Sequence, residues 1–184
     1  MSKSFKPSLD FRNKYLTWSK GLYEIYYDSA GNMCFVLSLA QVPKIEDGKL
    51  ILENPVTFKT AGAELTDEGK DALQPGKAFL LQKDYITTLR IEGPLDNTIS
   101  ADAAQKLTEK RAMAVCKWLV ENGIDCNRLI AVDFGNTKPI VSNDDPMSKA
   151  QNRRMEFVLA AMRGKAIGGM PMDGGGIIAG DVCK

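Results

Sequence analysis

The 184-residue chain contains no histidine. Histidine is the usual general acid or base near neutral pH and the commonest metal ligand in proteins. An enzyme without it would need two carboxylates with well-separated pKa values in one cleft, and no such pair stands out in the sequence. We therefore expect a protein that is not an enzyme, with no catalytic residue, no metal and no cofactor.

Long apolar runs are also missing. The longest, residues 33–40, falls well short of the roughly 20 residues that a membrane-spanning helix requires, so it is interpreted as a buried strand. The formal net charge is only +1. A chain this close to neutral has no general electrostatic attraction to nucleic acid or to an anionic membrane surface. The sequence thus predicts no nucleic-acid partner and no transmembrane segment.

A secretory signal is not visible at the start of the chain. Residues 1–10 are polar and basic, but neither an apolar region nor a small-residue cleavage site follows them. Either the protein stays in the cytosol or the chain is a trimmed part of a longer protein, and the sequence leaves both open.

Cysteine is scarce, and no C-x-x-C pair occurs, which argues against a zinc site. The four cysteines are Cys34, Cys116, Cys126 and Cys183. Cys116 and Cys126 flank the end of a predicted helix, so a disulfide between them is one interpretation in an oxidising compartment. The other is that these cysteines are buried or surface thiols.

Apolar periodicity and turn residues predict the order of the elements. Strands are expected at residues 22–27, 33–39, 50–58, 85–93, 129–134 and 153–161, and helices from residue 66 and over 102–122. Pro55 should place its strand at an edge or in a bulge, and Pro75-Gly76 should kink or restart the first helix. This order indicates an α+β fold, a two-layer sandwich of a mixed sheet with helices on one face.

The same pattern divides the chain into three parts. Residues 1–48 form an extension. Its residues 28–32 have the composition of a turn, which predicts an N-terminal β-hairpin. Residues 49–162 form the main domain, with a long polar loop at 135–151. Residues 163–184 are rich in glycine and lack periodicity, so they are expected to be a flexible tail.

Arg111 does not fit the helix that carries it. It lies four residues after Leu107 and four before Val115, which places a charge on the apolar side. Such a side chain must reach outward or find an anionic partner. Asp96 follows a predicted strand and precedes this helix, at an edge where ligands often bind. The pair is either a simple salt bridge or a receptor for a zwitterion, with Asp96 accepting from an ammonium group and Arg111 gripping a carboxylate.

Several spaced segments resemble the OmpA-like peptidoglycan-binding domains. I-E-G-P-L-D-N at residues 91–97 resembles their I-E-G-H-T-D-N, L-T-E-K-R-A at 107–112 resembles L-S-x-x-R-A, and N-R-R-M-E-F at 152–157 resembles N-R-R-V-E-F. The segments between them, at 123–129 and 134–139, also match in order. The resemblance extends over about residues 49–161.

This resemblance implies a βαβαβ-type mixed sheet and non-covalent binding of the peptidoglycan stem peptide through diaminopimelate. The matching positions for the two charged groups are Asp96 and Arg111, and the matching segments add Asn97, Thr98, Leu107 and Arg154 as candidate ligand-binding residues. Arg154 has an alternative reading as the structural partner of an acid.

The sequence departs from the family pattern around this site. Pro94 and Leu95 stand where the family has His-Thr, Ala104 stands where it has asparagine, and Ser148 stands where it has glycine. Each change removes a hydrogen-bonding group or a backbone freedom near the expected pocket.

Two functions follow as expectations. The first is anchoring of an envelope protein to the cell wall in the periplasm, associated with the outer membrane, with diaminopimelate-containing peptidoglycan as partner. The second is a degenerate module that no longer binds peptidoglycan and instead contacts other envelope proteins.

Overall fold

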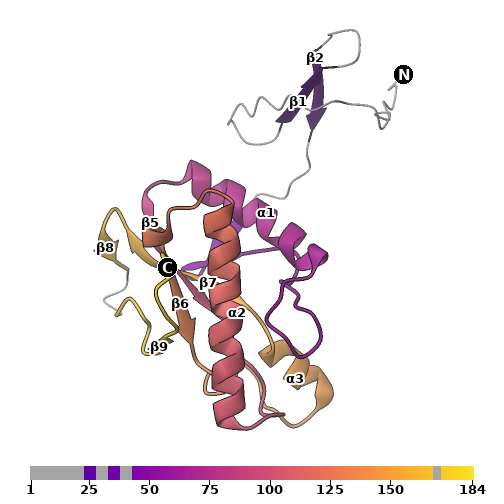
Figure 1. The fold of residues 1–184 in the computed structure, drawn as a ribbon, viewed down its shortest axis with the longest axis vertical. Helices are drawn as coiled ribbons and strands as arrows, with labels where there is room; N and C mark the ends of the chain where they lie inside the picture. Colours follow the sequence, from indigo (N-terminus) through magenta and orange to yellow (C-terminus); the bar gives the residue numbers. More distant parts are fainter. Residues whose placement is uncertain (1–22, 28–32, 38–42, 168–170) are drawn as a thin grey trace. The chain divides into compact units, whose positions relative to one another are not determined.

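A computed structural model describes residues 23–27, 33–37, 43–167 and 171–184 of the chain (Figure 1). The chain divides into two compact units, Met1–Gln41 and Val42–Lys184. In the first unit, β1 (Tyr23–Tyr27) and β2 (Met33–Leu37) pair antiparallel with Tyr23 opposite Leu37. This confirms the predicted hairpin, whose expected turn at 28–32 lies outside the described residues.

The second unit is built on one mixed sheet. Its strand order is β3-β4-β7-β5-β6-β9, and β8 also pairs with β7. β5 and β6 run parallel, as a helical crossover between them requires, and the other neighbours are antiparallel. The strands are β3 (Lys44–Glu46), β4 (Lys49–Ile51), β5 (Ile86–Glu92), β6 (Leu129–Asp133), β7 (Glu156–Met162), β8 (Lys165–Ala166) and β9 (Ile177–Ile178). The predicted mixed sheet is therefore confirmed.

Two long helices begin at hydroxyl caps. α1 (Asp67–Gln82) starts after Thr66, whose side chain accepts from the amide of Gly69, and α2 (Ala101–Glu121) starts after Ser100 in the same way. α1 continues through Pro75, so the predicted restart is wrong. The next residue, Gly76, lies against the strand layer, where an added Cβ would be 3.0 Å from Leu52 Cδ2.

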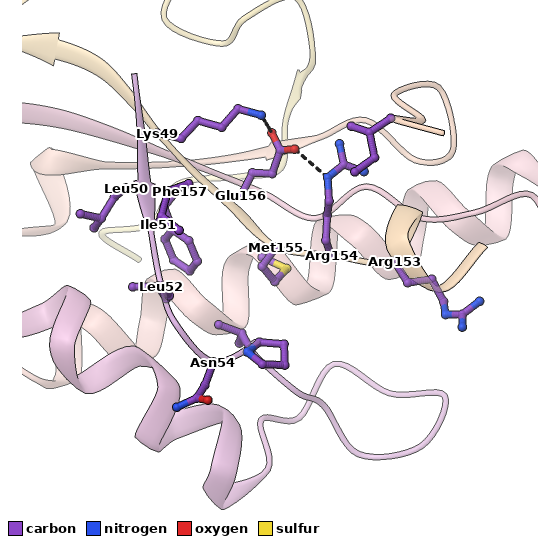
Figure 2. A pocket seen from close by; sticks show the side chains of 13 residues that line it. Lys49, Leu50, Ile51, Leu52, Asn54, Arg153, Arg154, Met155, Glu156 and Phe157 are labelled. Atoms are coloured by element: carbon purple, nitrogen blue, oxygen red, sulfur yellow. Dashed lines mark hydrogen bonds and ion pairs between the residues drawn. The ribbon is translucent and has the colours of Figure 1, made fainter. Parts of the chain in front are cut away.

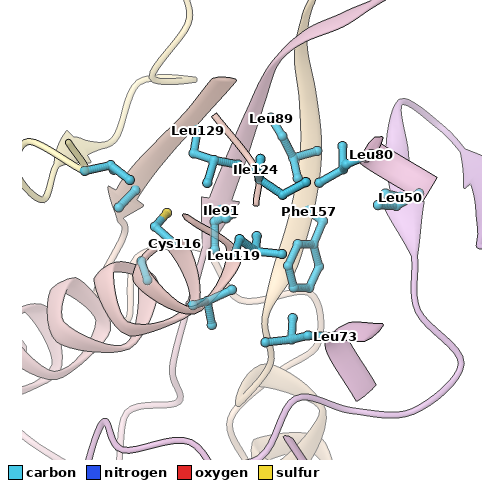
Figure 3. Close-up of a cluster of buried hydrophobic side chains, with 14 of the residues drawn as sticks. Leu50, Leu73, Leu80, Leu89, Ile91, Cys116, Leu119, Ile124, Leu129 and Phe157 are labelled. Carbon is cyan, nitrogen blue, oxygen red and sulfur yellow. The ribbon is translucent and has the colours of Figure 1, made fainter. Parts of the chain in front are cut away.

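One hydrophobic core joins the helices to one face of the sheet (Figure 3). β5 and β7 alternate, so that Leu89, Ile91, Phe157 and Leu159 face the core. The helices supply a complementary apolar side, with Leu73 and Leu80 from α1 and Val115, Cys116 and Leu119 from α2. In Figure 1, α2 lies across β5, β6 and β7. The predicted two-layer arrangement with helices on one face is confirmed.

Three local elements differ from the sequence expectations. The strand expected at 50–58 ends at Ile51, and beyond it Phe58 only forms an isolated bridge with Leu65. β3, which was expected to be a polar break, pairs with β4 through a turn whose central residues both have positive φ, Asp47 at 48° and Gly48 at 71°. The polar loop expected at 135–151 contains a short helix, α3 (Pro146–Asn152).

The start of α3 explains two residues of that loop. Asp145 caps the helix by accepting from the amides of Met147 and Ser148. Pro146 occupies the first turn, where its missing N–H costs nothing. Asn152 then holds the loop through the amides of Ile140 and Val141.

The C-terminal segment differs most from its prediction. The described residues after 163 are not a free tail, because β8 pairs with β7 and β9 pairs with β6. Val182 is only 8% exposed and joins the core. Cys183 forms a disulfide with Cys126, which lies in the short 3-10 helix η1 (Cys126–Arg128). Of the two interpretations of Cys116, the disulfide with Cys126 is wrong and the buried thiol is confirmed, because Cys116 faces the core from α2 and is fully buried as a free thiol.

Among the described helices, none combines the length and the apolar character needed to cross a membrane.

Candidate ligand-binding site

The candidate site begins where β5 ends. Gly93 follows the strand in a crowded position, since an added Cβ would lie 2.9 Å from Met155 Sδ and 3.8 Å from the carbonyl oxygen of Thr108. The chain after β5 is therefore packed closely against the middle of α2. Asp96 follows three residues after Gly93, and Arg111 follows three residues after Thr108. Asp96 and Arg111 make no hydrogen bond or ion pair with each other among the described residues.

Asp96 is a buried carboxylate that is fully ionised at neutral pH. It is 3% exposed, Oδ1 accepts from the amide of Thr98 at 3.0 Å, and Oδ2 pairs with Nη1 of Arg153. Burial alone would raise the pKa of Asp96, but the Thr98 amide and the Arg153 guanidinium together outweigh it and lower the pKa. The structure therefore pairs Asp96 with Arg153, an ion pair that the sequence did not predict.

Arg111 is held by the loop that precedes α1. Its Nε donates to the carbonyl oxygen of Gly62 at 2.9 Å, and its guanidinium carbon lies 4.8 Å from the centre of the Phe58 ring. The side chain is half-buried, and burial lowers the pKa of the guanidinium. Within the described parts of the chain, its two terminal nitrogens have no hydrogen-bond or ion-pair partner. Arg111 is thus a partly desolvated cation whose fork is open.

The flanking residues expected in the site have different surroundings. Asn97 and Thr98 are exposed at the turn before α2, and Leu107 is half-buried on the helix. Thr98 contributes through its backbone amide, which orients Asp96.

Arg154 is the structural partner of an acid, which is one of the two roles that the sequence left open for it. Its Nε lies 2.6 Å from Oε1 of Glu156, and its terminal nitrogens donate to the carbonyl oxygens of Asn152 and Lys138. Glu156 also pairs with Lys49 at 2.9 Å. Burial opposes ionisation of Glu156 most strongly, yet these cations lower its pKa. Arg154 and Arg153 point to different partners, as the strand period indicated.

The departures from the family pattern are mostly packing residues. Pro94, Leu95 and Ala104 are buried, so their side chains fill the interior rather than line an open surface. Ser148 is part of the α3 cap, where its hydroxyl bonds to Asp145 at 2.5 Å. The substitutions therefore alter the support of the site and leave its two central charges in place.

A separate cavity of about 340 Å³ lies beside the start of β7 (Figure 2). Its walls are largely apolar, and the Lys49–Glu156–Arg154 ion pairs close one side of it, as Figure 2 shows. Asp96 and Arg111 are not among its lining residues, but Arg153 is. Arg153 therefore touches both the cavity and the carboxylate of Asp96.

Known proteins share both sequence and fold with this chain. The sequence matches the OmpA family over residues 57–153. It is 34% identical over 113 residues to the probable lipoprotein YiaD of Escherichia coli strain K12, covering 61% of this chain and 51% of YiaD. It is 28% identical over 166 residues to outer membrane protein A of Bordetella avium, covering 84% and 85%. The peptidoglycan-binding protein ArfA of Mycobacterium tuberculosis is 32% identical over 105 residues, 57% of this chain and 32% of ArfA.

The chain therefore spans about half the length of YiaD and about a third of ArfA. Among solved structures, the cell wall anchor of the T6SS from Pseudomonas aeruginosa has a TM-score of 0.54 at 24% identity, covering 66% of this chain and 90% of that one. The periplasmic domain of Helicobacter pylori MotB has a TM-score of 0.53 at 23% identity, covering 63% and 85%. At these identities the two structures establish the fold. Because the family match includes more than half of the sequence, the chain belongs to the OmpA family.

Proposed function

We propose that this domain binds peptidoglycan non-covalently through the diaminopimelate of the stem peptide and so anchors an envelope protein to the cell wall. The free end of that residue carries an ammonium group and a carboxylate on one carbon. In the proposed complex Asp96 accepts from the ammonium group and Arg111 binds the carboxylate. Asn97, Thr98 and Leu107 flank the bound residue, and Arg154 supports the site through Glu156.

The observation that carries the proposal is the state of Arg111. A half-buried guanidinium without an acidic partner among the described residues has lost part of its hydration with no compensating ion pair. An anionic ligand group would supply that partner. A planar carboxylate fits the two terminal nitrogens, which can donate two parallel hydrogen bonds.

Asp96 retains capacity for a second cation despite its pair with Arg153. An ionised carboxylate offers about four lone-pair sites. The Thr98 amide and Arg153 use one on each oxygen, so lone pairs remain for an ammonium group. Its lowered pKa keeps Asp96 anionic at neutral pH.

An envelope location is supported by the relatives and by cysteine chemistry. YiaD carries the name of a lipoprotein, and the Bordetella relative that of an outer membrane protein. The Cys126–Cys183 disulfide requires an oxidising compartment in a mesophile. Both fit a domain in the periplasm, associated with the outer membrane.

The test is calorimetric titration of the protein with meso-diaminopimelate, alongside co-sedimentation with purified sacculi. Arg111→Ala should abolish binding and leave the fold intact. Lys117→Ala is the matched control, because it removes the same charge from an exposed position on the same helix. Arg111→Lys, which keeps the charge and loses the fork, should bind far more weakly than the parent. Parent-like binding by Arg111→Ala would overturn the assignment.

The second candidate function is a module that contacts other envelope proteins. The altered residues Pro94, Leu95, Ala104 and Ser148 favour it, because they remove hydrogen-bonding groups near the charges. A parent protein that neither binds meso-diaminopimelate nor sediments with sacculi, and that forms a stable complex with an envelope protein, would establish this alternative.

A further inference from the structure

We propose that the 58–65 loop positions Arg111, and that this makes the site selective for a stem peptide with diaminopimelate over the same peptide with lysine. The inference rests on the proposed function and concerns how its carboxylate receptor is built. Phe58 and Gly62 are assigned as positioning residues, since they touch Arg111 and not the ligand.

The loop holds Arg111 from two directions. The Phe58 ring supports the guanidinium at 4.8 Å, and the Gly62 carbonyl takes the Nε hydrogen at 2.9 Å. A cation on an aromatic face and a hydrogen bond on one edge together restrict rotation of the guanidinium. The edge formed by the two terminal nitrogens is then left for a ligand, and no described residue occupies it.

The loop is itself rigidly closed. Phe58 bridges to Leu65, and inside this bridge the Lys59 amide donates to the Glu64 carbonyl at 2.8 Å and the Gly62 amide to the Lys59 carbonyl at 2.9 Å. At its tip Ala61 has a φ of 55°, a strained conformation for a residue with a side chain. Such strain persists where the surroundings enforce it. Here the turn that contains Ala61 presents the Gly62 carbonyl to Arg111.

The first turn of α1 packs closely against the residues that begin and end the loop. Gly69 leaves no space for a side chain, because an added Cβ would lie 2.3 Å from the carbonyl oxygen of Thr57. The hydroxyls of Thr57 and Thr66 bond to each other at 2.6 Å. The start of α1 therefore fixes both ends of the loop, and the position of Phe58 follows from them.

This arrangement predicts which ligand group depends on the loop. A pre-oriented guanidinium loses less side-chain freedom when it binds a carboxylate, and its partial burial strengthens the attraction. The diaminopimelate side chain ends in an ammonium group and a carboxylate, whereas lysine ends in an ammonium group alone. Asp96 can serve both, so only the carboxylate requires Arg111 and the loop.

The experiment compares two stem tripeptides that end in meso-diaminopimelate or in L-lysine, titrated calorimetrically into the full chain. The parent should prefer the diaminopimelate peptide. Phe58→Leu, which keeps apolar volume and loses the aromatic face, should weaken that peptide about tenfold and leave the lysine peptide unchanged. Phe58→Tyr should restore parent affinity. Phe79→Leu removes another cation–aromatic contact, with Lys83 at 5.9 Å, at the opposite end of α1 from the loop and should not change the preference.

A double variant separates positioning from folding. In an Arg111→Ala background, Phe58→Leu should have no further effect on either peptide. Equal weakening of both peptides by Phe58→Leu, or an additive effect in the double variant, would overturn the inference. Failure of the parent to bind either peptide would instead refute the proposed function, so the two failures are distinguishable.

Discussion

The disulfide between Cys126 and Cys183 offers a prediction whose size follows from the fold. It joins residues 57 positions apart and ties the C-terminal segment to η1. Closing a loop of that length lowers the chain entropy of the unfolded state by about 14 cal/mol/K, or about 4 kcal/mol at 25 °C. A chain of this size should then lose on the order of 10 °C in melting temperature when the bridge is removed.

The test is guanidinium unfolding of the Cys126→Ser/Cys183→Ser variant against the oxidised parent. Cys116→Ala is the control, because it changes a cysteine in the core and leaves the bridge intact. Hydrogen exchange should show in addition that the Ala179 amide, which donates to the Ala131 carbonyl at 2.9 Å, loses protection in the bridge variant. An unchanged unfolding midpoint with full protection of Ala179 would refute the reasoning, since strand pairing alone would then hold the segment.

Two further predictions concern titration. The folded-state pKa values of Asp96 and Glu156 lie below their ordinary values of 3.8 and 4.5, so their contribution to stability is present above those values and is lost as the pH falls through the lowered folded-state pKa values. With no histidine in the chain, the free energy of unfolding should stay nearly flat from about pH 6 to 8 and fall steeply only in acid. Thermal unfolding across pH 3–8 measures this dependence. Glu156→Gln should reduce the loss of stability in acid. A steep change in stability near pH 6.5 would contradict the assignment of the titration to Asp96 and Glu156. Burial raises the pKa of the Cys116 thiol to about 12, so in a Cys34→Ser background alkylation at pH 8 should label the protein only after unfolding. Rapid labelling of the native protein would place Cys116 at the surface.

The sequence predicted those parts of the fold that carry strong local patterns. The hairpin at 23–37, the helix at 101–121 and the strands at 86–92 and 129–133 were all placed within a few residues. Their apolar residues recur regularly over enough positions to specify both the type of element and the face that lies toward the core. β3 was missed because three residues carry almost no period, although the Asp47-Gly48 turn was a usable hairpin signal.

The residues of the candidate site also divide into those that the sequence identified and those that only the fold reveals. Arg111 was identified because a charge at a core-facing helical position conflicts with its own helix. Phe58 and Gly62, which lie some fifty residues earlier, become its neighbours only through the packing of the 58–65 loop. The pair between Asp96 and Arg153 likewise joins residues far apart in the chain. No local pattern encodes such contacts, so the sequence reveals the unsatisfied group and the fold reveals what surrounds it.

The glycines of the C-terminal segment show how composition can mislead. They predicted flexibility, yet two of them are required by contact: an added Cβ would lie 2.4 Å from Arg90 Cζ at Gly174 and 2.4 Å from Val132 Cγ1 at Gly176. Arg90 in turn donates to the Met172 carbonyl at 3.0 Å and pairs with the fully buried Glu92. A segment of larger residues could not lie this close, and the Arg90–Glu92 pair would then be exposed to water.

Residues 172–176 therefore have a structural role over Arg90 and Val132, whereas Val182 of the same segment joins the core. Buried ion pairs stabilise a fold only when their remaining hydrogen-bonding groups are satisfied, and here a backbone carbonyl of the segment satisfies Arg90. The match to the OmpA family ends at residue 153, so this cover lies outside the matched region. The close glycine contacts, the β9–β6 pairing and the disulfide act together, because each holds the same short stretch against the sheet.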